Sequence, residues 1–405
     1  MPSVHCQSGR SADDQPGSSC AASTGYPLRG PLLLLADDLT GACDSGLAFA
    51  KQGLGVSVLW FPAEEMGEVE AGVVAVSVQT RDLPAEAMRC RMEDLARRRS
   101  FAEGILFHKV DSAGRGNPGA EMLVLAALGG CDSVVYAPAF PIAGRIVLNG
   151  RLRVSDFCGQ QTEVDLLQLL PAEARERVAR IPVCAEDALR RQMLAAHAAG
   201  KDIWLCDAME QQDLDRVAAV AWELPLQLQW SGSAGLAAAV AGRVSAASGA
   251  GEACPVALPA DGRTLVIAGT DHPVTVEQLR RLAPHAAELS IEEAAPAPEF
   301  ACGLVRVDWS TATAQGLRGF WQRAQKAGHA KIDTLVLTGG DTAAFVLESL
   351  GAESLELRGE VELGIPWSVV RGGLADGCMA MTKSGGFGRE ESLTGMVEFC
   401  RRMRA

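Results

Sequence analysis

The stretch TLVLTGGDTAAFVLESLG, Thr334 to Gly351, decides the fold of this chain. Its apolar run Leu335 to Leu337 predicts a buried strand, Gly339-Gly340 predicts a tight turn, and Thr342 to Leu350 predicts an apolar-rich helix. A strand that enters a helix through glycines lets the backbone approach an anion closely. The unpaired amides and the positive dipole end of such a helix favour phosphate.

A second glycine turn, MTKSGGFG at Met381 to Gly388, adds a lysine and could wrap the same ligand. Together the two stretches predict a nucleotide phosphate site. The sequence contains no G-x-x-x-x-G-K-[ST] pattern, which excludes a P-loop enzyme.

Upstream of this stretch, short apolar segments such as LLLLA, VSVLWF, VVAVSV, ILFHKV and SVVYAP are separated by helical ones. This alternation predicts a largely parallel α/β sheet, and TLVIAGT, GLVRVDW and TLVLTGG begin a second α/β unit. We therefore expect two α/β domains with largely parallel sheets and an active site in the cleft between them. The expected divisions are a disordered tail at 1–30, a first domain at 31–245, a Gly/Ala/Pro-rich linker at 246–261 and a second domain at 262–405.

Composition limits the classes of partner. The chain has 405 residues, enough for two domains, and is 48% hydrophobic and 21% charged, as in soluble globular proteins. A formal charge of -13 argues against a nucleic-acid or anionic membrane surface. The 12 cysteines are scattered without C-x-x-C spacing, which favours reduced thiols and a cytoplasmic location.

An acidic pair, Asp37 and Asp38, follows the first predicted strand, and Thr40-Gly41 open a helix. Carboxylates at the carboxyl end of a parallel strand can accept hydrogen bonds or a proton from substrate hydroxyls. The alternative is that Asp38 or Thr40 only caps the helix. Capping explains one acidic residue but not two. Arg81 follows another predicted strand and is interpreted together with this pair.

A denser polar loop follows the strand Ile105 to Val110. Lysine and arginine beside a glycine turn suit the capture of a carboxylate, and the alternative is a solvated loop. Gly114-x-Gly116-x-x-Gly119 also matches the dinucleotide-binding pattern, but Arg115 and Pro118 interrupt the turn, so we interpret it as coincidental. The candidate residues of this loop are Lys109, Asp111, Ser112, Arg115 and Asn117.

Six motifs occur in the order seen in the four-carbon acid sugar kinases, and the chain resembles that family from Pro31 onward. The motifs are ADDLTGA (Ala36 to Ala42), KVDSAGRGN (Lys109 to Asn117), PAFPIAGR (Pro138 to Arg145), GSAGLA (Gly232 to Ala237), GGDTA (Gly339 to Ala343) and KSGGFG (Lys383 to Gly388).

The resemblance implies an ATP-dependent kinase that phosphorylates the terminal hydroxyl of a four-carbon sugar acid such as threonate, erythronate or 3-oxo-tetronate. It implies a sugar-acid site in the N-terminal domain and an ATP site in the C-terminal domain. The implied substrate residues are Asp37, Asp38, Arg81, Lys109, Asp111, Ser112, Arg115 and Asn117. The implied nucleotide residues are Thr270, His272, Gly339, Gly340, Asp341, Thr342, Gly385 and Gly386.

Two positions depart from the family pattern. Ala113-Gly114 replace a Thr-Leu pair, which loosens the substrate loop and bears on which acid fits. Asp271 and His272 stand near ATP in place of small hydroxyl residues.

Phosphoryl transfer needs positioning and charge compensation, so we expect Mg²⁺ held mainly by phosphates and water, with Asp341 as the protein ligand. Asp341 could instead only cap its helix. Asp38 is the expected general base.

Two other functions are compatible with parts of the sequence. A nicotinamide-dependent dehydrogenase of a small hydroxy acid would use the Gly114 to Gly119 turn. A non-catalytic sugar-acid-binding protein would not need the C-terminal glycine loops. The sequence leaves open the stereochemistry of the acid, the general base and a homo-oligomeric assembly.

Overall fold

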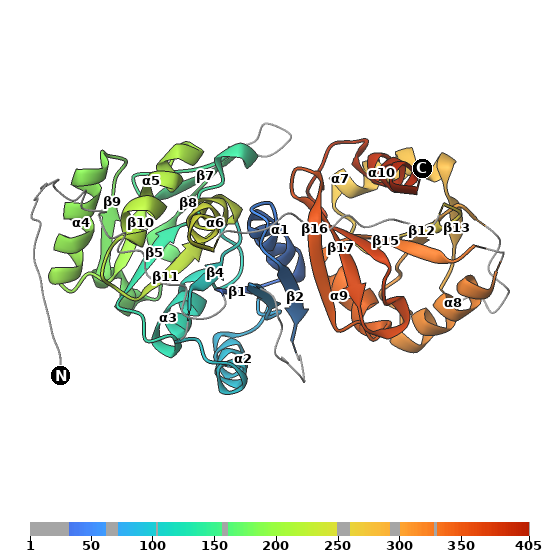
Figure 1. Ribbon diagram of the computed structural model, residues 1–405, viewed down its shortest axis with the longest axis horizontal. Helices are drawn as coiled ribbons and strands as arrows, with labels where there is room; N and C mark the ends of the chain where they lie inside the picture. The colour runs from blue at the N-terminus through green and yellow to red at the C-terminus, as the bar shows by residue number, and fades with distance from the viewer. Residues whose placement is uncertain are drawn as a thin grey trace, which may run out of the picture.

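The computed structural model describes residues 32–61, 72–102, 104–155, 161–248, 260–291, 300–327 and 330–404. The predicted tail at 1–30 lies outside the described residues, as does most of the predicted linker, residues 249–259. The helix α6 (Ala234–Ser248) extends into the first three linker positions. Figure 1 shows an N-terminal half in blue to green and a C-terminal half in orange to red.

A single large sheet runs through both halves of the described chain, in the order β13-β14-β12-β15-β18-β17-β16-β2-β3-β1-β4-β11-β5-β10-β9. In the order along the sheet, the block from β2 to β9 and the block from β13 to β18 each consist of parallel strands. The hairpin of β16 and β17 pairs antiparallel with both neighbours and joins the two parallel blocks. The predicted largely parallel α/β fold is confirmed, and the two parallel blocks form one continuous sheet, which the sequence pattern does not predict.

The bounds of these strands are β1 (Leu32–Ala36), β2 (Val56–Trp60), β3 (Val73–Ser77), β4 (Leu106–Lys109), β5 (Ser133–Ala137), β9 (Val178–Ile181), β10 (Ile203–Cys206), β11 (Leu228–Gly232), β12 (Arg263–Ala268), β13 (Ala287–Leu289), β14 (Cys302–Arg306), β15 (Ile332–Thr338), β16 (Ser354–Glu362), β17 (Ile365–Arg371) and β18 (Met379–Lys383).

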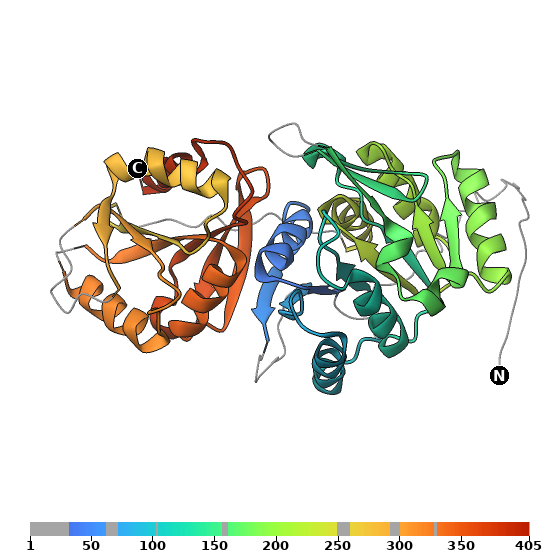
Figure 2. The same cartoon turned by 180° about the vertical axis from the view of Figure 1, so that it is seen from behind.

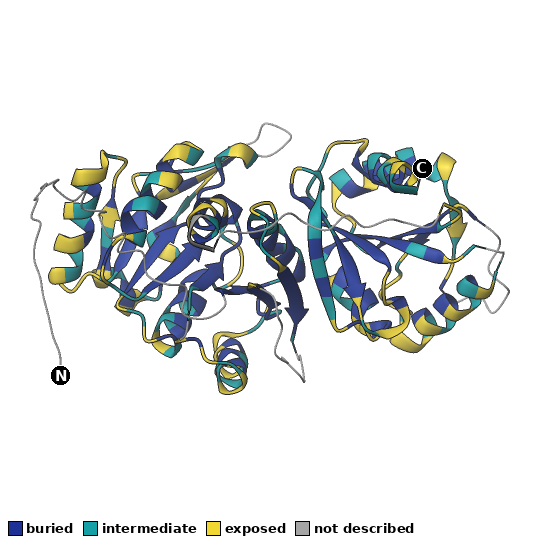
Figure 3. Cartoon of the chain, viewed as in Figure 1, coloured by how far each residue is buried: buried dark blue, intermediate teal, exposed yellow. Residues whose placement is uncertain are grey.

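Helices cover both faces of the sheet, so most of its strands are buried, whereas the helices expose their outer sides (Figure 3). Strands buried on both faces need continuous apolar sequence, as in LLLLA of β1. Other than α6, the α-helices are α1 (Leu39–Ala50), α2 (Ala85–Arg98), α3 (Pro118–Leu128), α4 (Glu186–Ala198), α5 (Gln211–Trp222), α7 (Pro273–Leu282), α8 (Ala314–Lys326), α9 (Gly340–Ser349) and α10 (Ser392–Arg404).

A small antiparallel sheet, β6-β7-β8, extends from the carboxyl end of the first parallel block. Its strands are β6 (Arg145–Leu148), β7 (Arg151–Ser155) and β8 (Gln161–Asp165). Asp207, just after β10, accepts hydrogen bonds from the amides of Asn149 and Gly150 in the β6-β7 turn, at 2.8 and 2.9 Å. This attachment places Arg145, the first residue of β6, beside the strand ends that carry the acidic pair.

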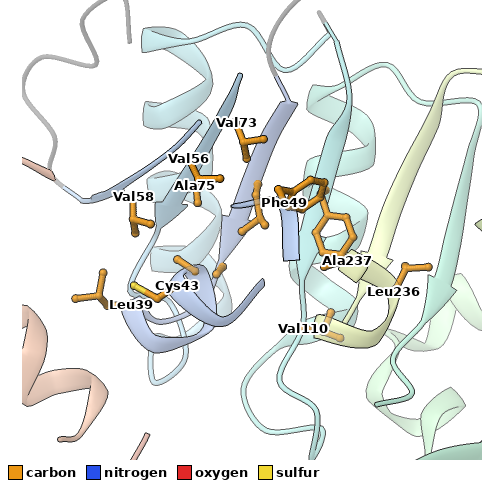
Figure 4. Packing of buried hydrophobic residues seen from close by; sticks show 14 of the residues in the cluster. Leu39, Cys43, Phe49, Val56, Val58, Val73, Ala75, Val110, Leu236 and Ala237 are labelled. Carbon is orange, nitrogen blue, oxygen red and sulfur yellow. The ribbon is translucent and has the colours of Figure 1, made fainter. Parts of the chain in front are cut away.

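Helix α1 lies at the junction of the two halves, against β2 and β16 (Figures 1 and 2). Its first residue, Leu39, belongs to one buried apolar cluster together with Phe49, Val58 and Leu357 (part of it is drawn in Figure 4). At Gly46 a Cβ would lie 2.9 Å from Leu357 Cδ1, so a glycine permits this close packing. The start of α1 therefore has a fixed position relative to the C-terminal half.

No helix within the described ranges is both long and apolar enough to span a bilayer.

We expect Leu357→Ala to lower the free energy of unfolding by about 2–5 kcal/mol, because it leaves a cavity between α1 and β16. Leu357 is 5% exposed, whereas Leu363, at the tip of the same hairpin, is 43% exposed. Leu363→Ala is the matched control and should change stability by less than about 0.5 kcal/mol. Urea unfolding of both variants measures this, and equal losses would contradict the packing described for the junction.

Candidate active site

The centre of the site is the side chain of Arg81, which contacts three carboxylates. Its Nε and Nη2 donate to the two oxygens of Asp37 at 2.8 and 2.9 Å, and its Nη1 donates to Asp38 Oδ2 at 2.9 Å. Nη2 also lies 3.6 Å from Asp111 Oδ2. The guanidinium thus joins residues that follow β1 and β4, and it compensates charges that would otherwise repel one another.

The backbone before Arg81 is turned into position by Gln79, whose φ of 50° lies in the left-handed region. Arg91, on α2, donates from Nη1 to the carbonyls of Val78 and Gln79 at 3.1 and 2.8 Å. The Gln79 side chain donates to Glu348 Oε1 on α9 at 2.8 Å. Hydrogen bonds therefore hold the loop that carries Arg81 to both halves of the chain.

Asp38 caps α1, as the alternative interpretation expected: its Oδ1 accepts from the amide of Gly41 at 2.8 Å. Its other oxygen accepts from Thr40 Oγ1 at 2.6 Å and also faces the C-terminal half. A Cβ at Gly340 would lie 3.1 Å from Asp38 Oδ2. The side chain of Asp38 therefore both caps α1 and lies between the two halves of the chain.

The environments of the other two carboxylates differ. Burial, followed by the charge of Asp38, raises the pKa of Asp37, although Arg81 opposes the shift. Burial also opposes ionisation of Asp111, but hydrogen bonds and charge from Arg115, helped by Lys109 and Arg81, hold its pKa well below the usual range.

The loop after β4 is closed on itself. Arg115 Nη2 donates to Asp111 Oδ2 at 2.7 Å, and the amide of Ala113 donates to Asp111 Oδ1 at 2.9 Å. Lys109 is buried, and its Nζ donates to the carbonyl of Val110 at 2.9 Å. Asn117 donates to the carbonyl of Leu83 at 2.9 Å and lines neither of the cavities described below.

The glycines of the Gly114 to Gly119 pattern have local roles. Gly114 and Gly116 have left-handed φ values of 80° and 78°. A Cβ at Gly119 would lie 2.3 Å from the carbonyl oxygen of Leu169, so this position needs glycine for close packing. Loop geometry and packing account for the pattern without a dinucleotide.

In the C-terminal half, Gly339 has a φ of 103° and turns the chain from β15 into α9. The backbone amides of Gly340, Asp341 and Thr342 donate no hydrogen bond to any residue that the structure describes. They form the open first turn of a helix, which is a favourable environment for an anion.

The KSGGFG loop is organised from behind by Lys383, which is fully buried. Its Nζ donates to the carbonyls of Ser384 and Phe387 at 3.0 and 3.2 Å and to Thr275 Oγ1 at 3.1 Å. Thr275 Oγ1 in turn donates to the carbonyl of Gly385 at 2.7 Å. The lysine thus holds the loop rather than wrapping a ligand, because its ammonium is directed away from the cleft.

Because the carbonyls of the KSGGFG loop accept hydrogen bonds from Lys383 and Thr275, the amides of this loop remain available to a ligand. Within the described residues, the amides of Ser384, Gly385 and Gly386 have no hydrogen-bond acceptor. The neighbouring loop after β12 packs against them: a Cβ at Gly385 would lie 2.8 Å from Thr270 Oγ1, and one at Gly386 would lie 3.1 Å from His272 Nε2. Successive free amides form a concave anion-binding surface.

The two halves enclose a cavity of about 1220 Å³. All eight predicted nucleotide residues line it, together with Asp37, Asp38, Arg81 and Arg115 from the N-terminal half. Sequence analysis missed its apolar wall, which includes Val276, Trp309 and Phe345. The rings of Trp309 and Phe345 meet edge to face at 5.5 Å. The sequence signal that could have identified this wall is the tryptophan at the end of GLVRVDW, which follows an apolar strand.

A smaller cavity of about 70 Å³ adjoins the large one. It is lined by the predicted substrate residues Lys109, Asp111 and Ser112, by Arg145, for which the sequence left open an anion contact or a charge at the rim, and by Asp44, which sequence analysis did not select. Five residues line both cavities: Asp38, Thr40, Arg81, Arg115 and Ser384. Asp44 could have been found from helical periodicity, because it follows Thr40 by four positions on the same face of α1.

Residues 32–240 match the family described as a sugar-binding N-terminal domain, and residues 299–393 match a nucleotide-binding C-terminal domain. The chain is 30% identical to a D-threonate kinase of Cupriavidus necator over 89% of this chain and 96% of that protein. It is 24% identical to a D-erythronate kinase of Heliobacterium modesticaldum over 91% and 96%. A Haemophilus influenzae crystal structure superposes with a TM-score of 0.64 at 19% identity, over 91% of this chain and all of that one, and shows the same fold.

We expect the stability difference between the protein and its Lys383→Met variant to depend on pH. Burial lowers the pKa of Lys383 to about 7, whereas an unfolded lysine titrates near 10.4. Between these values the unfolded chain binds more protons, so the protein should gain stability relative to the variant by up to about 1.4 kcal/mol per pH unit. Urea unfolding from about pH 6 to about pH 10 measures this difference. A difference that does not change with pH would contradict the burial of this ammonium.

Proposed function

Because the chain belongs to the four-carbon acid sugar kinase family and is a sugar-acid kinase, we propose that it uses ATP to phosphorylate the terminal (4-) hydroxyl of a four-carbon acid. The candidate acids are D-threonate, D-erythronate and 3-oxo-tetronate. Kinases among the similar proteins favour this function over a nicotinamide-dependent dehydrogenase or a non-catalytic sugar-acid-binding protein.

One observation supports the proposal most directly: Asp38 lines both cavities and lies against the first turn of α9. An acceptor hydroxyl in the small cavity and a phosphoryl donor in the large one would meet beside its carboxylate. Positioning of this kind provides much of the catalysis of phosphoryl transfer.

The triphosphate of ATP would bind two sets of free amides, those at 340–342 and those at 384–386. The apolar wall that includes Trp309 and Phe345 would contact the base. Mg²⁺ would offset the phosphate charge. The described residues contain no group of three or more His, Cys, Asp or Glu that could hold a metal. Phosphate oxygens and water would be the main ligands of Mg²⁺, with Asp341 as one protein ligand.

The carboxylate of the acid would bind Lys109 and Arg145 in the small cavity. Lys109 Nζ donates one of its three hydrogens to the carbonyl of Val110. Arg145 lies with its guanidinium carbon 5.7 Å from the ring centre of Phe387, and its buried Nε has no acceptor within the described residues. A bound carboxylate would satisfy this donor.

Asp38 is the proposed general base. Its Oδ2 accepts hydrogen bonds from Arg81 and Thr40 and would accept the proton of the attacking hydroxyl. Arg81 and Arg115 would stabilise charge on the transferred group, because both line the two cavities.

The proposed partners are the sugar acid, ATP and, in a homo-oligomer, further copies of this chain. A cytoplasmic location fits the cysteines of the described ranges, which are all free. Release of ADP from Mg-ATP in the presence of each of the three acids tests the proposal. Absence of acid-dependent ADP release would overturn it.

We expect Asp38→Asn to lower kcat by about 10²- to 10⁴-fold while ATP affinity barely changes. Asparagine caps a helix about as well as aspartate, so stability should be retained and the loss should come from the missing basic oxygen. Steady-state kinetics with a parallel unfolding measurement separates the two roles. Near-wild-type turnover would show that Asp38 caps α1 and does not act as the general base.

Gly340→Val should abolish detectable ATP binding and leave binding of the acid measurable. The new side chain would begin 3.1 Å from Asp38 Oδ2 and would cover the free amides of α9. Gly242→Val is the control, because no atom lies within 4 Å of a Cβ at this helical glycine. Calorimetry with ATP and with the acid compares the variants, and unchanged ATP affinity in Gly340→Val would exclude these amides as the phosphate site.

A further inference from the structure

Asp44 is the one carboxylate of the small cavity that has no hydrogen bond or ion pair with a described residue. The other two are engaged: Asp38 with Arg81 and Thr40, and Asp111 with Arg115. Asp44 is half-buried on α1. The side chain thus lines the cavity, and no described residue donates a hydrogen bond to its oxygens.

The surroundings of Asp44 are polar and confined. A Cβ at Gly364, in the β16-β17 turn, would lie 3.8 Å from Asp44 Oδ1, an ordinary contact distance, so this turn borders the carboxylate. Burial raises the pKa of Asp44 to about 6, the charge of Lys109 opposes the shift, and Glu360 and Asp38 add to it. The group is thus mostly ionised at neutral pH, and an ionised carboxylate away from bulk water needs hydrogen-bond donors.

We propose that Asp44 accepts a hydrogen bond from a hydroxyl group on the carbon chain of the acid and thereby selects hydroxylated acids over their deoxy analogues. This inference rests on the proposed function. It assigns complementary roles within one cavity: Lys109 and Arg145 bind the carboxylate, and Asp44 binds a chain hydroxyl.

Asp44 is distinct from the proposed base. Asp38 lines both cavities and lies against the α9 turn, whereas Asp44 lines only the small one. Asp44 therefore contacts the acid away from the phosphoryl group and acts as a specificity-determining residue. A site built to hydrogen-bond a substrate hydroxyl discriminates strongly against an analogue without it, because the buried polar group is then left unpaired.

The test compares two acceptors, the best of the three four-carbon acids and 4-hydroxybutanoate, which keeps the terminal hydroxyl and lacks the others. We expect the wild type to prefer the hydroxylated acid in kcat/KM by about 10³-fold or more. Asp44→Ala should reduce this preference by about 10²-fold, because the hydroxylated acid loses its acceptor while turnover of 4-hydroxybutanoate is retained.

Two further variants control the test. Asp44→Asn retains an acceptor oxygen and should keep more of the preference than alanine. Asp94→Ala removes an aspartate on α2 that pairs with Arg97 and Arg98, outside both cavities, and should leave the preference unchanged.

The outcomes distinguish the two proposals. If the wild type phosphorylates a four-carbon acid and Asp44→Ala loses activity equally on both acceptors, or keeps the full preference, the role of Asp44 in selection is wrong and the kinase function stands. If the wild type phosphorylates none of the acids, both proposals fail.

Discussion

The contact of Arg81 with three carboxylates is the interaction on which the site depends. Asp37 and Asp38 follow β1, and Asp111 follows β4, so adjacent parallel strands bring like charges together at one edge of the sheet. Without a cation between them, these groups would repel one another and would take up protons. With Arg81 in place, Asp38, the loop after β4 and the helix α1 share one fixed geometry.

Under the proposed function the C-terminal half has the opposite electrostatic requirement, because the triphosphate of ATP would need hydrogen-bond donors and the formal net charge of the chain is -13. Donors are supplied by backbone rather than by side-chain cations. Lys383 and Thr275 hold the carbonyls of the KSGGFG loop on its inner side, and the amides of the same loop then face the cleft.

The two halves are joined through the core as well as through the chain. The β16-β17 hairpin pairs with β2, and α1 packs against β16 with a glycine at the closest point. Asp38 and Asp44, both carried at or near the start of α1, are consequently placed by contacts with both halves. The distance between the small cavity and the α9 turn is therefore defined by apolar packing, which has little tolerance for displacement.

Sequence by itself determined the features that depend on local pattern. Continuous apolar runs identified the buried parallel strands, glycines identified the turns into α9 and after β18, and Asp38 was recognised both as a cap and as a candidate base. The tail and linker predictions fall mostly outside the described residues.

Tertiary structure alone decided which of these local features meet. It joined two sheets through a hairpin, turned Lys383 away from the cleft, and brought Asp44, Arg145 and Trp309 into the cavities from distant segments. The physical reason is that periodicity and turn chemistry report on neighbours in the chain. Which carboxylate is paired and which is left free depends instead on contacts between residues far apart in sequence.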